Sequence, residues 1–246
     1  LFTDGALGSR GACLLEPYND DPGNYGLLVT DPDKLRKYSR LAYENNFQVN
    51  THAIGDSANR LVLDIYSEFL DTINNRRWRI EHAQVIQPED FKRFGKYNVI
   101  PAINATHATS DMYWADERLG KKRLKHAYAY KKLLNENGWL PNGSDFPVEE
   151  INPLYGFYAA FARKDLNGKP RGGFQKENAL TRKEALKAMT RWAAKACFEE
   201  DRRGSIEKGK KADFVVTEKD IMRAEESVVP TIKVHQTFID GKPVIN

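Results

Sequence analysis

The sequence is poor in cysteine and has no long apolar run, and each of these shortages excludes a class of protein. Among its 246 residues are 2 cysteines, Cys13 and Cys197, which lie far apart and form no CxxC pair. We expect reduced thiols, because a disulfide framework needs more cysteines at closer spacing. No apolar run is long enough to span a membrane, and no secretory signal pattern opens the chain. We therefore expect a cytoplasmic protein with no membrane partner.

The chain also lacks an excess of charge of one sign. Its 38 basic and 34 acidic residues leave a net charge of +4, and the charges are scattered rather than gathered in a run. This distribution argues against a nucleic-acid partner.

A chain of this length can bury a sizeable core, and barrel folds often reach this length as one domain. One large domain with a small appendage is the natural expectation.

Apolar runs typical of buried strands alternate with amphipathic stretches typical of helices, which predicts an α/β fold. Repeated strand–helix units imply parallel strands joined by right-handed crossovers. Ser57 is the expected N-cap of the second helix. The expected strands cover 47–52, 78–82, 98–104 and 139–145, and the expected helices cover 33–46, 57–73, 87–97, 124–138, 153–164 and 181–198.

The C-terminal segment has a different character from the rest of the chain. Segments 204–216 and 235–245 are predicted to be strands, the second of them folded around a turn at Asp240 and Gly241. This part of the sequence is expected to form a small β appendage.

Three polar residues end expected strands: His52, His82 and Asp145. The two histidines are about thirty residues apart, which is the length of one βα unit. In parallel α/β folds the carboxyl ends of the strands share one face, so the three side chains can converge. Two imidazoles and a carboxylate are a normal ligand set for zinc or a similar divalent metal. The alternative is that both histidines bond to neighbouring backbone and that Asp145 is a turn residue or a helix N-cap.

Five short motifs follow one another along the whole chain: "DGALGSRGA" (4–12), "HAIGDSANR" (52–60), "RIEHAQ" (79–84), "NGSDFPVE" (142–149) and "GSIEKGKKADFVV" (204–216). Their order resembles that of the amidohydrolase superfamily, and more narrowly its YtcJ-like branch, which includes N-substituted formamide deformylases. The resemblance implies a distorted (β/α)8 TIM-like barrel with a small β-sandwich built from both chain ends. It assigns "HAIGD" to strand five, "RIEHAQ" to strand six and "GSDFPVE" to strand eight.

The resemblance also implies roles for the strand-end residues. His52 and His82 would be metal ligands, and Asp145 would bind the metal and take a proton from the attacking water. The expected cofactor is a divalent metal, zinc in the first place, with one or two ions in the complete enzyme. A bound divalent metal lowers the pKa of water to about 7, and a carboxylate touching that water can accept its proton. Asp56 could orient an imidazole or cap the following helix, and both interpretations stay open.

Two further residues follow the seventh strand that the resemblance implies. His107 and Asp111 lie where barrel loops carry substrate contacts, so we predict that both bind substrate. The alternative for His107 is an ordinary polar loop residue.

The sequence departs from the family pattern in its ligands. The His-x-His pair of the family's first strand does not occur, and the lysine of its fourth strand would stand just before Leu1. We expect residues 1–200 to be a partial barrel, from strand four or five to strand eight, and residues 201–246 to be the C-terminal part of the sandwich. A sheet with an open edge favours self-association, so we expect a homo-oligomer that is inactive as this chain alone.

The predicted function is that of a metal-dependent hydrolase that cleaves a non-peptide C–N bond, of the amide or N-formyl type, in a small-molecule substrate. The alternative is a non-catalytic fragment or domain that lacks a complete metal site.

Overall fold

Three short parallel strands form the sheet that carries the candidate site. β1 (Asn50–Ala53), β2 (Arg79–His82) and β3 (Ile100–Ala102) lie side by side in that order, and the register pairs Thr51 with Ile80. α2 connects β1 to β2, and α3 connects β2 to β3, as in repeated βα units. The predicted parallel arrangement of these three strands is confirmed.

The computed structural model describes residues 1–244, and Ile245 and Asn246, at the end of the last predicted strand, lie outside the described residues. Within residues 1–244 no helix is long and apolar enough to cross a membrane. The helices are α1 (Pro32–Glu44), α2 (Asp56–Ser67), α3 (Phe91–Lys96), α4 (Ala105–Asp111), α5 (Ala115–Leu124), α6 (Tyr130–Asn137), α7 (Pro153–Ala162), α8 (Arg182–Met189) and α9 (Arg191–Ala196), with 3-10 turns η1 (Lys176–Asn178) and η2 (Glu226–Thr231).

The prediction of a strand at 139–145 was wrong. This segment joins the sheet only through one parallel bridge, between Ile103 and Asn142. Ile103 N donates to Pro141 O at 2.9 Å, and Gly143 N donates to Ile103 O at 3.0 Å. Pro141 has no N–H to continue the ladder, which limits the pairing to this one step. Asp145 therefore follows a bridge rather than a full strand.

Helix boundaries also differ from the prediction: α2 ends at Ser67 and α3 begins at Phe91, and three further differences have identifiable causes. α2 begins at Asp56 with Gly55 as its N-cap, because Cys13 O accepts from Ser57 N and thereby satisfies a first-turn donor. The expected helix at 124–138 begins only at Tyr130, because the preceding residues end α5 and turn. The expected helix at 181–198 is divided into α8 and α9 at Thr190, whose φ of −127° and ψ of −91° are not helical.

The core lies between the parallel sheet and the helices that cover it. α2 turns Val62, Leu63 and Tyr66 towards the sheet, where Trp78 and Ile80 are fully buried. Burying one large apolar side chain stabilises a fold by about 1.5–3 kcal/mol. This packing fixes the strands whose carboxyl ends carry the histidines.

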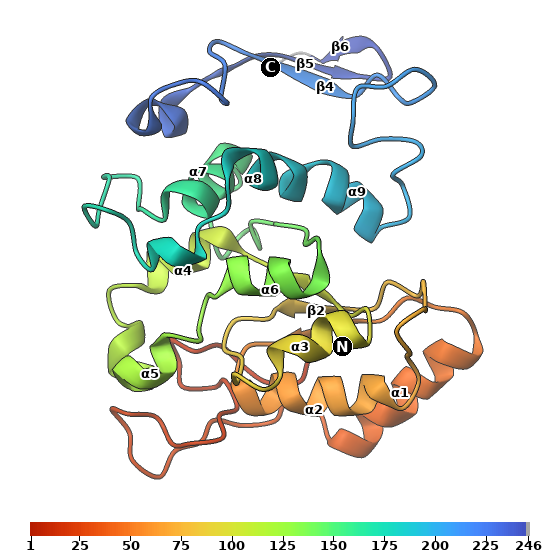
Figure 1. The fold of residues 1–246 in the computed structure, drawn as a ribbon, viewed down its shortest axis with the longest axis vertical. Helices are drawn as coiled ribbons and strands as arrows, with labels where there is room; N and C mark the ends of the chain where they lie inside the picture. Colours follow the sequence, from red (N-terminus) through yellow and green to blue (C-terminus); the bar gives the residue numbers. More distant parts are fainter. Residues whose placement is uncertain (245–246) are drawn as a thin grey trace.

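A second sheet is formed by β4 (Phe214–Thr217), β5 (Val234–Ile239) and β6 (Lys242–Val244), which are antiparallel in sequence order. Asp240 and Gly241, with φ of 49° and 75°, form the tight turn between β5 and β6, as predicted. Figure 1 shows this sheet at one end of the molecule, beyond α7, α8 and α9.

Candidate metal centre

Strand ends and the loops after them bring four polar side chains together. His52 is the third residue of β1 and His82 is the last residue of β2, and their rings lie 4.5 Å apart between centroids. The His107 ring, from α4, stacks on the His82 ring, with 5.6 Å between their centroids. His107 Nε2 is 3.8 Å from Asp145 Oδ2. Of the three side chains predicted to converge, His82 and Asp145 belong to one cluster, and the ring of His52 lies beside that of His82.

Three of these residues have the arrangement of metal ligands. His82, His107 and Asp145 each offer one ligand atom, and all three atoms lie within 4.8 Å of one another. His107, which we expected to contact substrate, thus joins the set in which His52 was expected. His52 Nε2 instead faces the Asp4 carboxylate, with Oδ1 at 3.4 Å.

The imidazoles have buried nitrogen atoms that lack hydrogen bonds. His52 Nε2, His82 Nδ1 and His107 Nε2 find no hydrogen-bond partner within residues 1–244. A buried polar atom left unsatisfied costs about 1–3 kcal/mol, and most such atoms in proteins are paired. Imidazole nitrogens beside a carboxylate are the ligands that zinc and related divalent metals take. The residues present therefore fit a divalent cation.

Electrostatics favours the neutral form of the imidazoles, which is the form that binds metal. Burial, together with the nearby His82 and His52, lowers the pKa of His107 to about 4, although Asp145 acts in the opposite direction. Burial and then His52 lower the pKa of His82. At neutral pH the rings of His82 and His107 are consequently neutral, and each has a lone pair that can bind a cation.

Two residues of the site have backbone in the left-handed region. The φ angles of His82 and Asp145 are 73° and 61°. This conformation costs a residue other than glycine about 1–2 kcal/mol. Such strain concentrates at functional sites, where the surrounding structure holds it in place. The two residues that carry it here are members of the same three-residue cluster.

Sequence reasoning missed Asp4, which lies behind His52. Its side chain is buried and accepts from three backbone N–H groups: Oδ1 from Ile54 at 3.0 Å, and Oδ2 from Gly55 at 2.8 Å and Cys13 at 2.9 Å. A carboxylate fixed in this way can orient the imidazole that it faces. The available signal was its place as the first residue of the "DGALGSRGA" motif.

Asp56 has a structural role. Its Oδ1 accepts from Leu15 N at 2.9 Å and Ser57 N at 3.0 Å, and its Oδ2 accepts from the Gln87 amide. Within residues 1–244 it makes no hydrogen bond with His52. Of the two interpretations open from the sequence, the structure favours the one in which Asp56 secures the start of α2.

Asp111 ends the short helix that carries His107, rather than lying in a loop. Its Oδ2 accepts from Tyr128 Oη at 2.8 Å and Gln84 Nε2 at 3.3 Å. Burial raises the pKa of Asp111 to about 7, although the hydrogen bond from Tyr128 acts in the opposite direction. The carboxyl can therefore donate or accept a hydrogen bond near neutral pH. Its contact with substrate remains a prediction.

The sequence is similar to proteins of one family along its whole length. Residues 1–245 match the model of the amidohydrolase family. The chain is 34% identical over 244 residues to YtcJ of Bacillus subtilis (strain 168), covering 99% of this chain and 46% of YtcJ. It is 40% identical over 219 residues to the protein LONG AFTER FAR-RED 3 of Arabidopsis thaliana, covering 87% of this chain and 37% of that protein.

More distant sequence similarity and a solved structure agree with these matches. The chain is 25% identical over 195 residues to N-substituted formamide deformylase of Arthrobacter pascens, covering 77% of this chain and 35% of that enzyme. A crystal structure of an uncharacterized metal-dependent hydrolase from Pyrococcus horikoshii OT3 superposes with a TM-score of 0.79 at 31% identity. The match covers 92% of this chain and 45% of the Pyrococcus chain. The chain thus spans less than half the length of these relatives.

Proposed function

Because the chain belongs to the amidohydrolase family, we propose that it is part of a metal-dependent hydrolase that cleaves a non-peptide C–N bond of the amide or N-formyl type. The resemblance to the YtcJ-like branch, drawn from five motifs, is confirmed by the family match and the similarity to YtcJ. The match to N-substituted formamide deformylase supports the choice of bond, since that protein's name states its substrate class.

The proposed architecture is a (β/α)8 barrel with a β-sandwich, of which residues 1–200 and 201–246 are the respective parts. Parallel β1, β2 and β3, bridged at one edge to Phe2 and at the other to Asn142, are compatible with a segment of a barrel. The antiparallel β4, β5 and β6 are compatible with one side of a sandwich.

The observation that carries the proposal is the set of unsatisfied imidazole nitrogens beside Asp145. His82 and His107 are more than nine-tenths buried, whereas the Asp145 side chain is 39% exposed. A buried nitrogen without a hydrogen bond needs a cation or a donor, and no donor reaches it within residues 1–244. The exposed Asp145 carboxylate is accessible to a small-molecule substrate.

These positions suggest a division of labour during hydrolysis. A bound divalent metal would polarise the scissile carbonyl and lower the pKa of water to about 7. His82 and His107 would hold it through neutral nitrogens. Asp145 would accept the proton of the attacking water and deliver it to the leaving nitrogen. Asp111, held by Tyr128 and Gln84, would orient the substrate by a hydrogen bond.

Zinc is the proposed metal, with one or two ions in the complete enzyme, and its binding to this chain tests the site directly. We expect equilibrium dialysis with zinc to show at least a tenfold loss of affinity in His82→Ala and in His107→Ala. His126→Ala removes a histidine that lies outside the cluster and should change nothing. Unchanged affinity in both cluster variants would contradict the proposal.

The same zinc-binding measurement shows whether His52 is a metal ligand. If His52→Ala weakens zinc binding as strongly as His82→Ala, His52 is a ligand, as the resemblance implies. If it has little effect, His107 takes that place, as the distances suggest.

A non-catalytic domain is the second candidate function. A non-catalytic domain would keep its fold with no response of zinc affinity to the cluster variants.

A further inference from the structure

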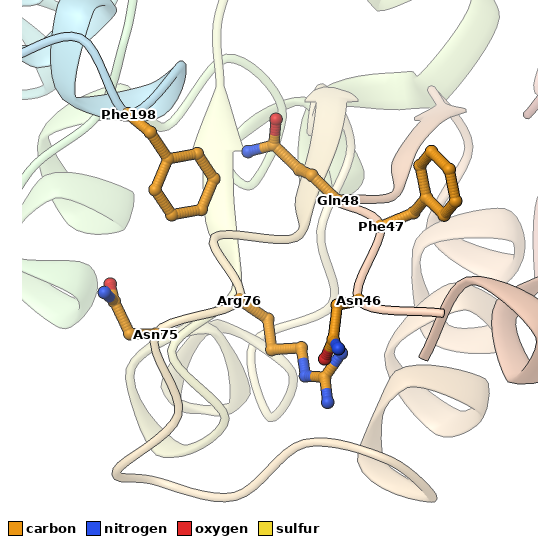
Figure 2. Close-up of a pocket in the computed structure, with 6 residues that line it drawn as sticks. All are labelled: Asn46, Phe47, Gln48, Asn75, Arg76 and Phe198. Atoms are coloured by element: carbon orange, nitrogen blue, oxygen red, sulfur yellow. The ribbon is translucent and has the colours of Figure 1, made fainter. Parts of the chain in front are cut away.

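A cavity of about 340 Å³ opens at the end of the parallel sheet away from the candidate metal centre. His52 and His82 lie near the carboxyl ends of β1 and β2, whereas the cavity is formed by the residues that precede these strands. Its volume is in the range of small-molecule sites. Figure 2 shows the lining residues, which are Asn46, Phe47, Gln48, Asn75, Arg76 and Phe198.

Two phenylalanine rings stand on opposite sides of the cavity (Figure 2). Phe47 is 68% exposed and Phe198 is 48% exposed, although their backbones are held. Phe47 N donates to Ala42 O at 2.8 Å, and Phe198 N donates to Lys195 O at 3.2 Å. Exposed aromatic rings at a concave site are typical of ligand contact. The Arg77 guanidinium lies over the Phe198 ring at 4.1 Å from its centroid, and the remaining surface of the two rings is apolar surface that a flat group can contact.

Arg76 supplies the cavity with a positive charge that no carboxylate neutralises. Its guanidinium lies over the Tyr43 ring at 4.0 Å, and its Nη1 donates to Tyr43 O at 2.8 Å. These contacts hold the group in place, and within residues 1–244 the Nε and Nη2 groups make no hydrogen bond. No ion pair joins Arg76 to an acidic side chain in the part of the chain that the structure describes. The adjacent Arg77, by contrast, pairs with both carboxylate oxygens of Glu200.

The segments around the cavity are held in an unusual backbone conformation. Asn46, Arg77 and Phe198 have φ angles of 58°, 54° and 60°, in the left-handed region. Asn46 and Phe198 directly follow the C-caps of α1 and α9, and the left-handed conformation there ends each helix and turns the chain at the cavity. Gln48 ties the segments together, because its Nε2 donates to Arg77 O at 2.6 Å and to Ala196 O at 2.7 Å. The cavity is therefore preformed, which lowers the entropic cost of binding.

We propose that this cavity binds a small aromatic carboxylate, with its ring against the phenylalanine side chains that line the cavity and its carboxylate on Arg76. The Nε and Nη2 donors of the guanidinium match the two oxygens of a carboxylate, which is the strongest arrangement of such a pair. Ring contacts with the two phenylalanines add apolar burial and specificity for a flat group. This site is separate from the metal centre, so the proposal does not depend on the proposed hydrolase function.

Titration of the whole chain with phenylacetate, followed by calorimetry, tests the proposal. We expect a Kd of about 1 mM, which corresponds to about −4 kcal/mol. Phenylacetamide, which has the ring without the charge, should bind at least tenfold more weakly, and acetate should show no binding. Addition of EDTA should leave phenylacetate binding unchanged, because the metal centre is not involved.

Two variants locate the site, and a third is a matched control. Arg76→Gln and Phe198→Ala should each weaken phenylacetate at least tenfold. Arg171→Gln removes another arginine that has no ion pair within residues 1–244 and should leave the Kd unchanged. Equal affinity for the acid and the amide, loss of binding with EDTA, or unchanged binding in both cavity variants would overturn the proposal. The comparison of ligands on the parent chain decides the matter even if a variant does not fold.

Discussion

At the scale of single residues, the side chains of the metal cluster differ in their exposure to solvent. The Asp145 side chain is 39% exposed, whereas that of His107 is 9% exposed. A buried neutral imidazole can hold a cation but cannot exchange protons readily with solvent or substrate. An accessible carboxylate can both bind a cation and exchange protons. Substitution of the histidines and of Asp145 should therefore have different effects.

We predict that Asp145→Asn in the complete enzyme lowers turnover 10²–10⁴-fold while much of the metal stays bound, since asparagine offers an oxygen but accepts no proton. His82→Ala should lose metal and activity together, because it removes a whole ligand. Turnover and metal content of the purified variants check this expectation. If Asp145→Asn kept more than about a tenth of the parent rate, the proton-transfer role would be wrong.

The buried carboxyl of Asp111 predicts a pH-dependent stability. Its pKa is raised to about 7 from an ordinary value of 3.8, so between these values the folded state holds a proton that the unfolded state releases. The free energy of unfolding should therefore fall as the pH rises from about 4 to about 7. Above about pH 7 this carboxyl should cause no further fall.

Urea unfolding at pH 5 and pH 8 measures the effect. In the parent, the free energy of unfolding should fall by on the order of 2 kcal/mol between pH 5 and pH 8 because of this carboxyl. In Asp111→Asn this fall should be absent. Asp116→Asn changes an exposed carboxylate on α5 and is the control. Identical pH dependence in the parent and Asp111→Asn would show that this carboxyl titrates normally.

At the scale of elements, the first turn of α2 is held by the loop at Cys13 as well as by the side chain of Asp56. Cys13 O accepts from Ser57 N at 3.1 Å, and Gly55 N donates to Asp4 Oδ2 at 2.8 Å. This close approach requires glycine, since a Cβ on Gly55 would lie 1.9 Å from Cys13 O. The start of α2 and the carboxylate behind His52 thus depend on one contact.

Gly55→Ala should lower the free energy of unfolding by about 1–3 kcal/mol, because the loop must move away to make room. Gly143→Ala is a suitable control, since a Cβ there would meet only the Asn104 amide, at 4.0 Å. Urea unfolding of both variants tests the expectation. Equal stability of the two would mean that the loop yields without cost.

At the scale of the whole molecule, the antiparallel sheet leaves apolar side chains exposed. Val215 and Ile239 are each more than half exposed. They share one face, because Val215 pairs with Thr237 and Ile239 lies two residues further along β5. Exposed apolar faces and open sheet edges favour association between copies. This supports the expectation of a homo-oligomer.

We predict that the chain sediments as a dimer or a larger assembly and that the double variant Val215→Lys/Ile239→Lys shifts it towards monomer. Light scattering coupled to size-exclusion chromatography gives the mass directly. The double variant Lys208→Ala/Arg223→Ala changes exposed charges elsewhere and should leave the mass unchanged. A parent that is monomeric at high concentration would contradict the expectation.

The sequence by itself determined the features that depend on local spacing. Alternating apolar and amphipathic stretches predicted the parallel strands β1, β2 and β3, and Asp240 with Gly241 predicted the β5–β6 turn. One βα unit between His52 and His82 was enough to bring their rings together. These predictions succeeded because strand period and turn chemistry act over a few residues.

Only the tertiary structure decided what depends on contacts between distant segments. α4 and α5 lie in a polar stretch without clear periodicity, so their helices and the approach of His107 to His82 could not be predicted. Asp4 acquires its place from backbone groups of two other segments. The aromatic cavity joins segments 46–48 and 75–76 to Phe198. Such arrangements arise from packing of whole elements, which no local pattern encodes.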